Sequence, residues 1–136
     1  MTTYIPSDIR RIVIDRAAGR CKYCRIKESD TFCGCQIDHI ISEKHNGQTI
    51  ELNLAFTCAY CNRFKGSDIG SIASSTGEFT RFYNPRTDTW AEHFEFVDFR
   101  ILPLTAIGET TTQILKFNEF DRVLERRAIL DAENAE

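Results

Sequence analysis

Two pairs of cysteines with the spacing Cys-x-x-Cys constrain this chain more than any other feature. Cys21 and Cys24 form the first pair, and Cys58 and Cys61 form the second. Two such turns present four thiolates to one tetrahedral Zn²⁺ ion, and disulfides are uncommon in proteins without a secretion signal. We therefore expect a structural zinc site. The alternatives are buried free thiols, or a redox pair at one of the two motifs.

Two more cysteines, Cys33 and Cys35, lie between these pairs. They exceed the four thiolates that a tetrahedral zinc site needs. The sequence leaves three roles open for them: buried thiols, thiols that are sensitive to oxidation, or alternative zinc ligands.

The length and composition of the chain predict one globular domain over residues 1–136. Of the 136 residues, 42 % are hydrophobic and 27 % are charged, which is an ordinary mixture for a folded protein. No apolar run approaches the roughly 18 residues that a membrane span needs. Residues 1–6 also lack the basic and apolar segments of a signal peptide. We therefore expect a cytoplasmic protein without a membrane partner.

The net charge of −3 excludes a protein that holds nucleic acid by bulk positive charge alone. The charge is nevertheless uneven along the chain. Residues 1–27 carry seven basic and two acidic side chains, whereas residues 101–136 are acidic overall. The basic segment either faces phosphate or forms the solvated face of a helix.

The hydrophobic pattern and turn residues of the first half predict a helix followed by strand, loop, strand and helix. Ser7 is the expected N-cap of the first helix, and Gly19 follows its end. The pair Asn46-Gly47 marks a turn between the two strands. The expected elements are a helix over residues 8–18, strands over residues 36–41 and 52–57, and a helix over residues 60–66.

The second half is expected to begin with a surface loop over residues 67–78, which are rich in Ser, Gly and Thr. Residues 79–99 are dense in aromatic side chains, which more often form a core than a platform for stacked bases, and we expect short extended pieces there. Two helices are expected over residues 105–116 and 118–132, with Asn118 as N-cap of the second. These helices would cover the core or form a dimer interface.

Asp38 and His39 lie next to each other in the first predicted strand. A carboxylate is a hard oxygen ligand suited to Mg²⁺ or Mn²⁺, and a histidine takes a proton from water near neutral pH. A metal-bound carboxylate beside such a base is a workable apparatus for phosphodiester hydrolysis. Neighbours on a strand point to opposite faces, so both reach one site only if the strand bends or ends there. Taken alone, the pair is more simply a satisfied surface pair.

The wider segment contains Ile37-Asp38-His39-Ile40-Ile41, then Leu52-Asn53-Leu54, then the run from Cys58 to Gly66. On these residues it resembles the HNH endonuclease superfamily. Residues 82–86 and 90–94 are similar, less specifically, to a tail found in small stand-alone bacterial HNH proteins. The resemblance implies an α+β fold: a ββα-metal finger with a structural zinc site of four cysteines, flanked by an N-terminal helix and C-terminal helices. The motif core would span residues 21–66 and the C-terminal extension residues 67–136.

The resemblance also implies a role for each matching residue. His39 matches the general base that activates water. Asn53 matches the central residue that orients the histidine and its loop. Asp38 and Asn62 match the two ligands of a catalytic Mg²⁺ or Mn²⁺, which makes the chain an H-N-N variant. The residues that match the structural zinc ligands are Cys21, Cys24, Cys58 and Cys61.

The implied function is metal-dependent hydrolysis of phosphodiester bonds in DNA. Lys65, one helical turn after Asn62, is a candidate phosphate contact and equally a solvated charge. Arg63 and His45 are weaker candidates, since each is more simply a solvated side chain. Two alternatives stay open: a non-catalytic zinc module that binds nucleic acid or protein, and a nuclease directed at RNA. One motif makes one scissile site, so cutting of both strands would need a homodimer or two binding events.

Overall fold

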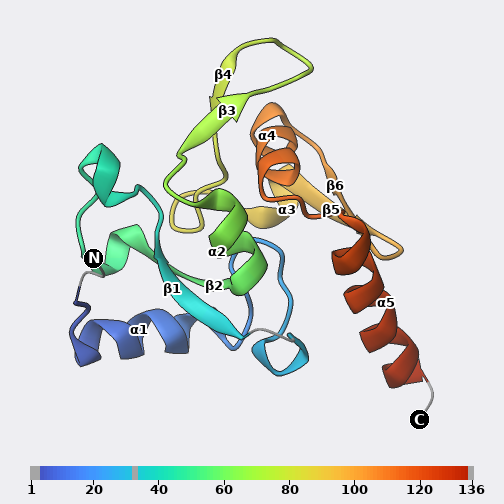
Figure 1. The fold of residues 1–136 in the computed structure, drawn as a ribbon, viewed down its shortest axis with the longest axis horizontal. Helices are drawn as coiled ribbons and strands as arrows, with labels where there is room; N and C mark the ends of the chain where they lie inside the picture. The colour runs from blue at the N-terminus through green and yellow to red at the C-terminus, as the bar shows by residue number, and fades with distance from the viewer. Residues whose placement is uncertain (1–3, 32–33, 135–136) are drawn as a thin grey trace. The chain divides into compact units, whose positions relative to one another are not determined.

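The computed structural model describes residues 4–31 and 34–134 and has mixed helices and small antiparallel sheets (Figure 1). This composition confirms the predicted α+β class. The chain divides into two compact units: residues 1–69 with 84–88, and residues 70–83 with 89–136. A single domain over the whole chain stays a prediction. Within the described part of the chain, no helix is long and apolar enough to cross a membrane.

The first unit is built around a two-stranded antiparallel sheet. Strand β1 (Cys35–His39) pairs with β2 (Leu54–Cys58), so that Cys35 lies opposite Cys58 and His39 opposite Leu54. Helix α1 (Ser7–Ala17) precedes the sheet, and α2 (Ala59–Lys65) follows β2 directly. Short 3-10 turns complete the unit: Glu28–Asp30, Glu43–His45 and Glu51–Asn53. The predicted order of strand, loop, strand and helix is confirmed.

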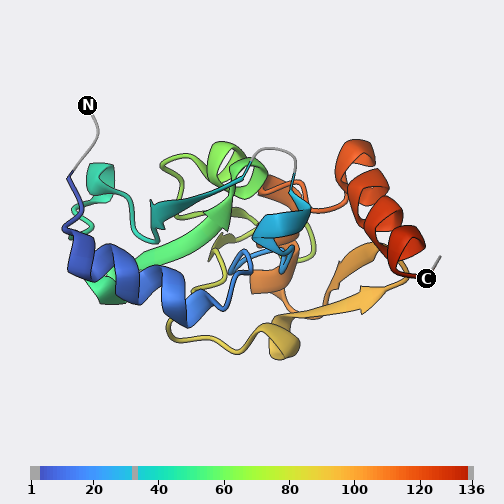
Figure 2. The same cartoon turned by 90° about the horizontal axis from the view of Figure 1, so that it is seen from below.

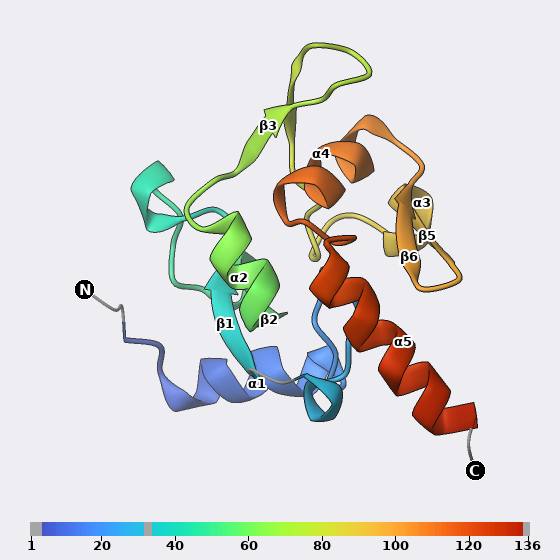
Figure 3. The ribbon, with the colours of Figure 1, turned by 45° about the vertical axis from the view of Figure 1, so that its right-hand side comes forward.

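The two faces of this sheet carry different side chains because neighbouring residues on a strand alternate. One face is apolar: Leu54 and Phe56 form a core with Val13 and Ala17 of α1, and Ile37 packs against it. Figure 2 shows α1 lying along this hairpin. The other face of β1 is polar and lies against α2 (Figure 3). The sheet therefore has a hydrophobic core on one face, and on the other face the side chains of Gln36 and Asp38 point toward α2.

The ends of α1 differ in part from the prediction. Ser7 is the first helical residue rather than the N-cap; Pro6 precedes the helix, and no side chain caps it. Proline has a fixed φ near −65° that leads readily into a helix, so a capping hydroxyl is not required. The end of the helix agrees with the prediction, since Ala18 and Gly19 both have positive φ, 53° and 76°.

In its described residues, the second unit holds two hairpins and three helices. Strand β3 (Gly70–Ile72) pairs with β4 (Phe79–Arg81), and β5 (Phe94–Val97) pairs with β6 (Arg100–Pro103). The helices of this unit are α3 (Trp90–His93), α4 (Ala106–Ile114) and α5 (Phe120–Asn134). Helix α4 packs on β3, β4 and β6 and so joins the two hairpins.

The aromatic segment mostly forms the core of this unit, as predicted. Phe94 is buried, and its ring lies 5.1 Å from that of Trp90, 5.4 Å from that of Tyr83 and 5.6 Å from that of Phe117. These separations are typical of packed aromatic pairs. Phe79 on β4 is an exception, since it is 63 % exposed.

Two predictions for this unit are wrong. Residues 70–72, expected in a surface loop, form β3, because the backbone of this polar segment finds a pairing partner in β4. Asn118 is not the N-cap of α5. Its side-chain amide binds the backbone N–H and C=O of Ile101 at 2.9 and 2.8 Å, and the helix begins two residues later at Phe120. The amide therefore ties the connection before α5 to β6.

Candidate functional site

Four buried cysteines converge at one point of the first unit. The sulfurs of Cys21, Cys24, Cys58 and Cys61 all lie within 4.8 Å of one another. A tetrahedral zinc site with Zn–S bonds of about 2.3 Å places its sulfurs about 3.8 Å apart, and the sulfurs of Cys24 and Cys58 are 3.7 Å apart. The donor set and its spacing fit a zinc ion.

Backbone hydrogen bonds support both Cys-x-x-Cys turns in the same way. The N–H of Cys24 donates to the sulfur of Cys21 at 3.5 Å, and the N–H of Cys61 donates to the sulfur of Cys58 at 3.4 Å. Burial raises the pKa of the Cys21 thiol well above its ordinary value. Hydrogen bonding to Cys21 instead lowers the pKa of the Cys58 thiol. Binding of a cation to the cluster would release protons from the thiols that are still protonated.

Of the two extra cysteines, Cys35 is the one within the described residues, and it lies outside this cluster. Cys35 is partly exposed at the start of β1 and does not belong to the group of four. Burial raises the pKa of its thiol to about 12, so Cys35 is a neutral thiol near pH 7 and not a reactive thiolate. Cys33 lies outside the described residues.

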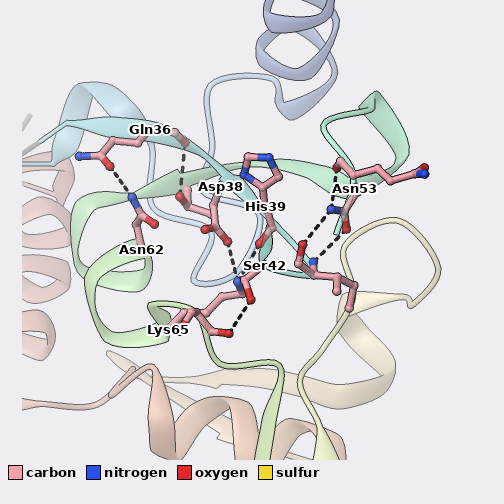
Figure 4. Close-up of polar contacts among 11 residues, drawn as sticks. Gln36, Asp38, His39, Ser42, Asn53, Asn62 and Lys65 are labelled. Carbon is pink, nitrogen blue, oxygen red and sulfur yellow. Dashed lines mark hydrogen bonds and ion pairs between the residues drawn. The ribbon is translucent and has the colours of Figure 1, made fainter. Parts of the chain in front are cut away.

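A buried ion pair joins the polar face of β1 to α2 (Figure 4). The ammonium of Lys65 lies 2.9 Å from Oδ2 of Asp38 and donates to the carbonyl oxygen of His39 at 2.9 Å. The side chains of Lys65 and Asp38 are only 1 % and 10 % exposed. Burial raises the pKa of the Asp38 carboxyl, and the Lys65 charge opposes this shift. Lys65 is directed at Asp38 and the strand, so its contact with phosphate stays a prediction.

Asn62 lies one turn before Lys65 on the same face of α2. Its Nδ2 donates to Oε1 of Gln36, which precedes Asp38 by two residues on β1. No other described residue bonds to the side-chain oxygen of Asn62. The two amides line an open pocket of about 350 Å³, which is also lined by Ala59, Tyr60, Arg63 and Gly66.

His39 is the last residue of β1. Its Nε2 lies 2.9 Å from the hydroxyl oxygen of Thr49 and 3.8 Å from a carboxylate oxygen of Glu43. Its Nδ1 has no partner in the described part of the chain. Figure 4 shows the ring of His39 and the carboxyl of Asp38 leaving the strand in different directions, as alternation requires. His39 ends the strand, but its ring does not lie on the face that carries Asp38, so the meeting of the two side chains at one site stays a prediction.

Asn53 fixes the loop that follows His39. Its Oδ1 accepts from the N–H of Ile41 at 2.9 Å, and its Nδ2 donates to the carbonyl oxygens of Ile41 and Gln48, each at 2.9 Å. The amide therefore holds both sides of the loop. Its contacts are with the loop backbone, while Thr49 holds the ring of His39.

The same loop makes a close turn at Asn46 and Gly47. Asn46 has φ 68°, in the left-handed region that asparagine tolerates. A Cβ at Gly47 would overlap the carbonyl oxygen of Ile41, the group that Asn53 binds. Ser42 adds a further tie by donating to the carbonyl oxygen of Ser67 at 2.7 Å.

The two remaining candidates, Arg63 and His45, are exposed. The guanidinium of Arg63 lies over two aromatic rings of α2, 4.9 Å from the centre of Phe64 and 5.7 Å from that of Tyr60. His45 ends the 3-10 turn Glu43–His45 in the loop after His39. Both side chains are accessible to a charged ligand in solution.

Residues 21–68 match the family model described as HNH endonuclease. This segment is an HNH domain. The match contains both cysteine pairs as well as Asp38, His39, Asn53 and Asn62, and it leaves the whole of the second unit outside. The domain indicates nuclease activity in general. No curated protein and no solved structure matches the chain.

The HNH domain contains three contacts that sequence reasoning did not find. Gln36 had a detectable signal, because it precedes Asp38 by two residues and must share its face of the strand. Thr49 and Ser42 had no such signal in the sequence, because the hydrogen-bond partners of their hydroxyls depend on the conformation of the loop. The burial of Lys65 follows from its place on the face of α2 that packs on β1.

Proposed function

We propose that this protein is a metal-dependent endonuclease that hydrolyses phosphodiester bonds in DNA. The observation that carries the proposal is the polar face between β1 and α2 of the HNH domain. Asp38, next to His39 at the end of β1, contacts Lys65 across this face, and Asn62 contacts Gln36 near the start of the strand. A carboxylate, an amide oxygen and an imidazole are the donor set that hydrolysis assisted by a divalent cation requires.

Asp38 and Asn62 would hold the catalytic cation. Their oxygens suit Mg²⁺ or Mn²⁺, and two protein ligands leave positions for water and for substrate oxygens. The free side-chain oxygen of Asn62 and the open pocket beside it support this assignment. The cation would supply charge stabilisation for the phosphate and for the leaving oxygen.

His39 would act as the general base. With a proton on Nε2 donated to the hydroxyl of Thr49, the lone pair of Nδ1 is available to a water molecule. Nδ1 takes one proton from that water as its oxygen forms a bond to phosphorus. The bond from phosphorus to the 3′ oxygen breaks, and this oxygen then takes up a proton from solvent. The products are a 3′ hydroxyl and a 5′ phosphate.

The four cysteines would hold a structural Zn²⁺. A site closed by four thiolates has no open position for substrate, so this ion would stabilise the fold and take no part in the chemistry. The first cysteine pair precedes β1 in the chain. The second pair joins the end of β2, at Cys58, to the first turn of α2, at Cys61. Arg63 and His45, both exposed, would contact phosphate.

Short end-labelled substrates test the substrate class and the base together. The zinc-loaded protein is incubated with a DNA duplex and with an RNA hairpin in Mg²⁺, and product ends are mapped. We expect DNA cleavage with 5′ phosphates, and no cleavage by His39→Gln. His93→Gln is the matched control; His93 lies in the second unit, with Nδ1 2.6 Å from the hydroxyl oxygen of Thr105, and this variant should retain cleavage.

Cleavage of RNA alone would replace the DNA assignment with an RNA-directed nuclease. Absence of cleavage in every condition, with zinc bound, would identify a non-catalytic zinc module. Cleavage by His39→Gln at the wild-type rate would remove the base from the mechanism.

A further inference from the structure

The two proposed cation ligands are each held by a partner from the opposite element. Asp38 belongs to β1 and is held by Lys65 of α2, whereas Asn62 belongs to α2 and is held by Gln36 of β1. The spacing explains the match: residues two apart share one face of a strand, and residues three apart share one face of a helix. The four side chains therefore form two pairs, each with one residue from the strand and one from the helix.

The Gln36 contact determines which atom Asn62 offers. A side-chain amide has one oxygen and one NH2 group, and only the oxygen binds a cation. Because Nδ2 donates to Oε1 of Gln36, the oxygen of Asn62 is turned away from Gln36 and toward open space. A rotated amide would instead present its NH2 group to the cation. Orientation therefore matters for an asparagine ligand in a way that it does not for a carboxylate.

We infer that Gln36 is a positioning residue that holds the amide oxygen of Asn62 in place for a divalent cation. The inference rests on the proposed function, because it takes Asn62 as a ligand. Gln36 is exposed and contributes little to the hydrophobic core. Its side chain accepts a hydrogen bond from Asn62. Partners that orient a metal ligand in this way typically change metal affinity by about 10–100-fold when they are removed.

Binding of Mn²⁺ alone tests the inference without reference to cleavage. The full zinc-loaded chain is titrated with Mn²⁺, and free Mn²⁺ is measured by its paramagnetic resonance signal. Gln36→Leu should weaken binding about tenfold. Gln36→Glu should retain or exceed wild-type affinity, because its carboxylate still accepts from Asn62. Gln113→Leu applies the same exchange to an exposed glutamine of α4 and should change nothing.

A second background isolates positioning from any general effect of Gln36. Asn62→Asp offers two equivalent oxygens, so its orientation no longer selects between a ligand and a donor group. In this background Gln36→Leu should weaken Mn²⁺ binding far less than about tenfold. An equal loss in both backgrounds would overturn the positioning role.

The failure of the inference differs from that of the proposed function. If the wild type binds Mn²⁺, Asn62→Ala weakens it and Gln36→Leu does not, the inference is overturned and the cation site stands. If the wild type binds no Mn²⁺ at a site sensitive to Asn62→Ala, both are overturned.

Discussion

At the residue scale, the ring of His39 depends on a loop hydroxyl. Thr49 lies ten residues further along the chain, and its Oγ1 is 2.9 Å from Nε2 of the ring. The hydroxyl holds Nε2 of the ring, and the amide of Asn53 holds the loop that carries the hydroxyl. The imidazole is therefore positioned by two neutral side chains.

Replacing Thr49 with valine should lower kcat about tenfold and leave KM nearly unchanged. The loss is well below the roughly 10²–10⁴-fold that a missing base causes, because the imidazole is still present. Thr49→Ser keeps the hydroxyl and should restore most of the rate. Steady-state cleavage kinetics of the three proteins make the comparison. A valine variant as fast as the wild type would show that the Thr49 contact is dispensable.

At the scale of elements, α2 is joined to β1 by a pair of opposite charges that is almost fully buried. Removing one partner of such a pair leaves an uncompensated charge in the interior. The geometry of the candidate site is thus tied to the stability of the strand–helix junction.

Lys65→Met should lower the free energy of unfolding by about 3 kcal/mol, because the Asp38 carboxylate loses its partner. The double variant Asp38→Asn, Lys65→Met should lose clearly less than the sum of the two single changes. Arg63→Met on the same helix is exposed and should lose less than about 1 kcal/mol. Urea unfolding with zinc present measures all four. Additive losses would contradict the coupling.

Binding of zinc should depend on the four clustered cysteines and not on Cys35. Cys58→Ser removes one member of the cluster at the start of α2, so it should abolish stoichiometric zinc and unfold much of the first unit. Cys35→Ser makes the same exchange opposite Cys58 in the sheet and should keep its zinc. Metal analysis measures the bound zinc of the two variants, and circular dichroism measures how much of each is folded. A zinc-free Cys35→Ser would make Cys35 a ligand.

The sequence predicted the elements of the HNH domain better than the contacts within it. The cysteine pairs, the helix after Cys58 and the turn at Asn46 follow from local spacing and turn chemistry. The partner of Lys65 does not, because it depends on how α2 packs on β1. For the same reason the sequence predicts Asn118 as a cap, because a local pattern cannot reveal that the backbone of β6 offers its amide two hydrogen bonds.

At the scale of the whole molecule, the proposed function requires two metal sites of different affinity in one chain. Four thiolates would hold zinc tightly, whereas one carboxylate and one amide would hold Mg²⁺ weakly until substrate completes the site. A low concentration of EDTA should therefore stop cleavage while the circular dichroism spectrum and bound zinc stay unchanged. Prolonged chelation should then remove zinc and unfold the protein. Loss of both at the same EDTA concentration would contradict two separate sites.

The acidic net charge of the whole chain has a consequence for binding. With a net charge of −3, the protein lacks the bulk attraction that dominates non-specific DNA binding. Under the proposed function, contacts with DNA would come from local basic residues, including the exposed Arg63 of α2. The sequence predicted this balance, since charge is a property of composition and needs no knowledge of the fold.

Nicking of supercoiled plasmid by purified, zinc-loaded protein tests the central claim most directly. The wild type and His39→Ala are compared in Mg²⁺, in Mn²⁺ and in EDTA, with zinc content and secondary structure measured on the same samples. The account predicts relaxation by the wild type in either cation, none in EDTA, and none by His39→Ala. No relaxation by a folded, zinc-loaded wild type in either cation would contradict it.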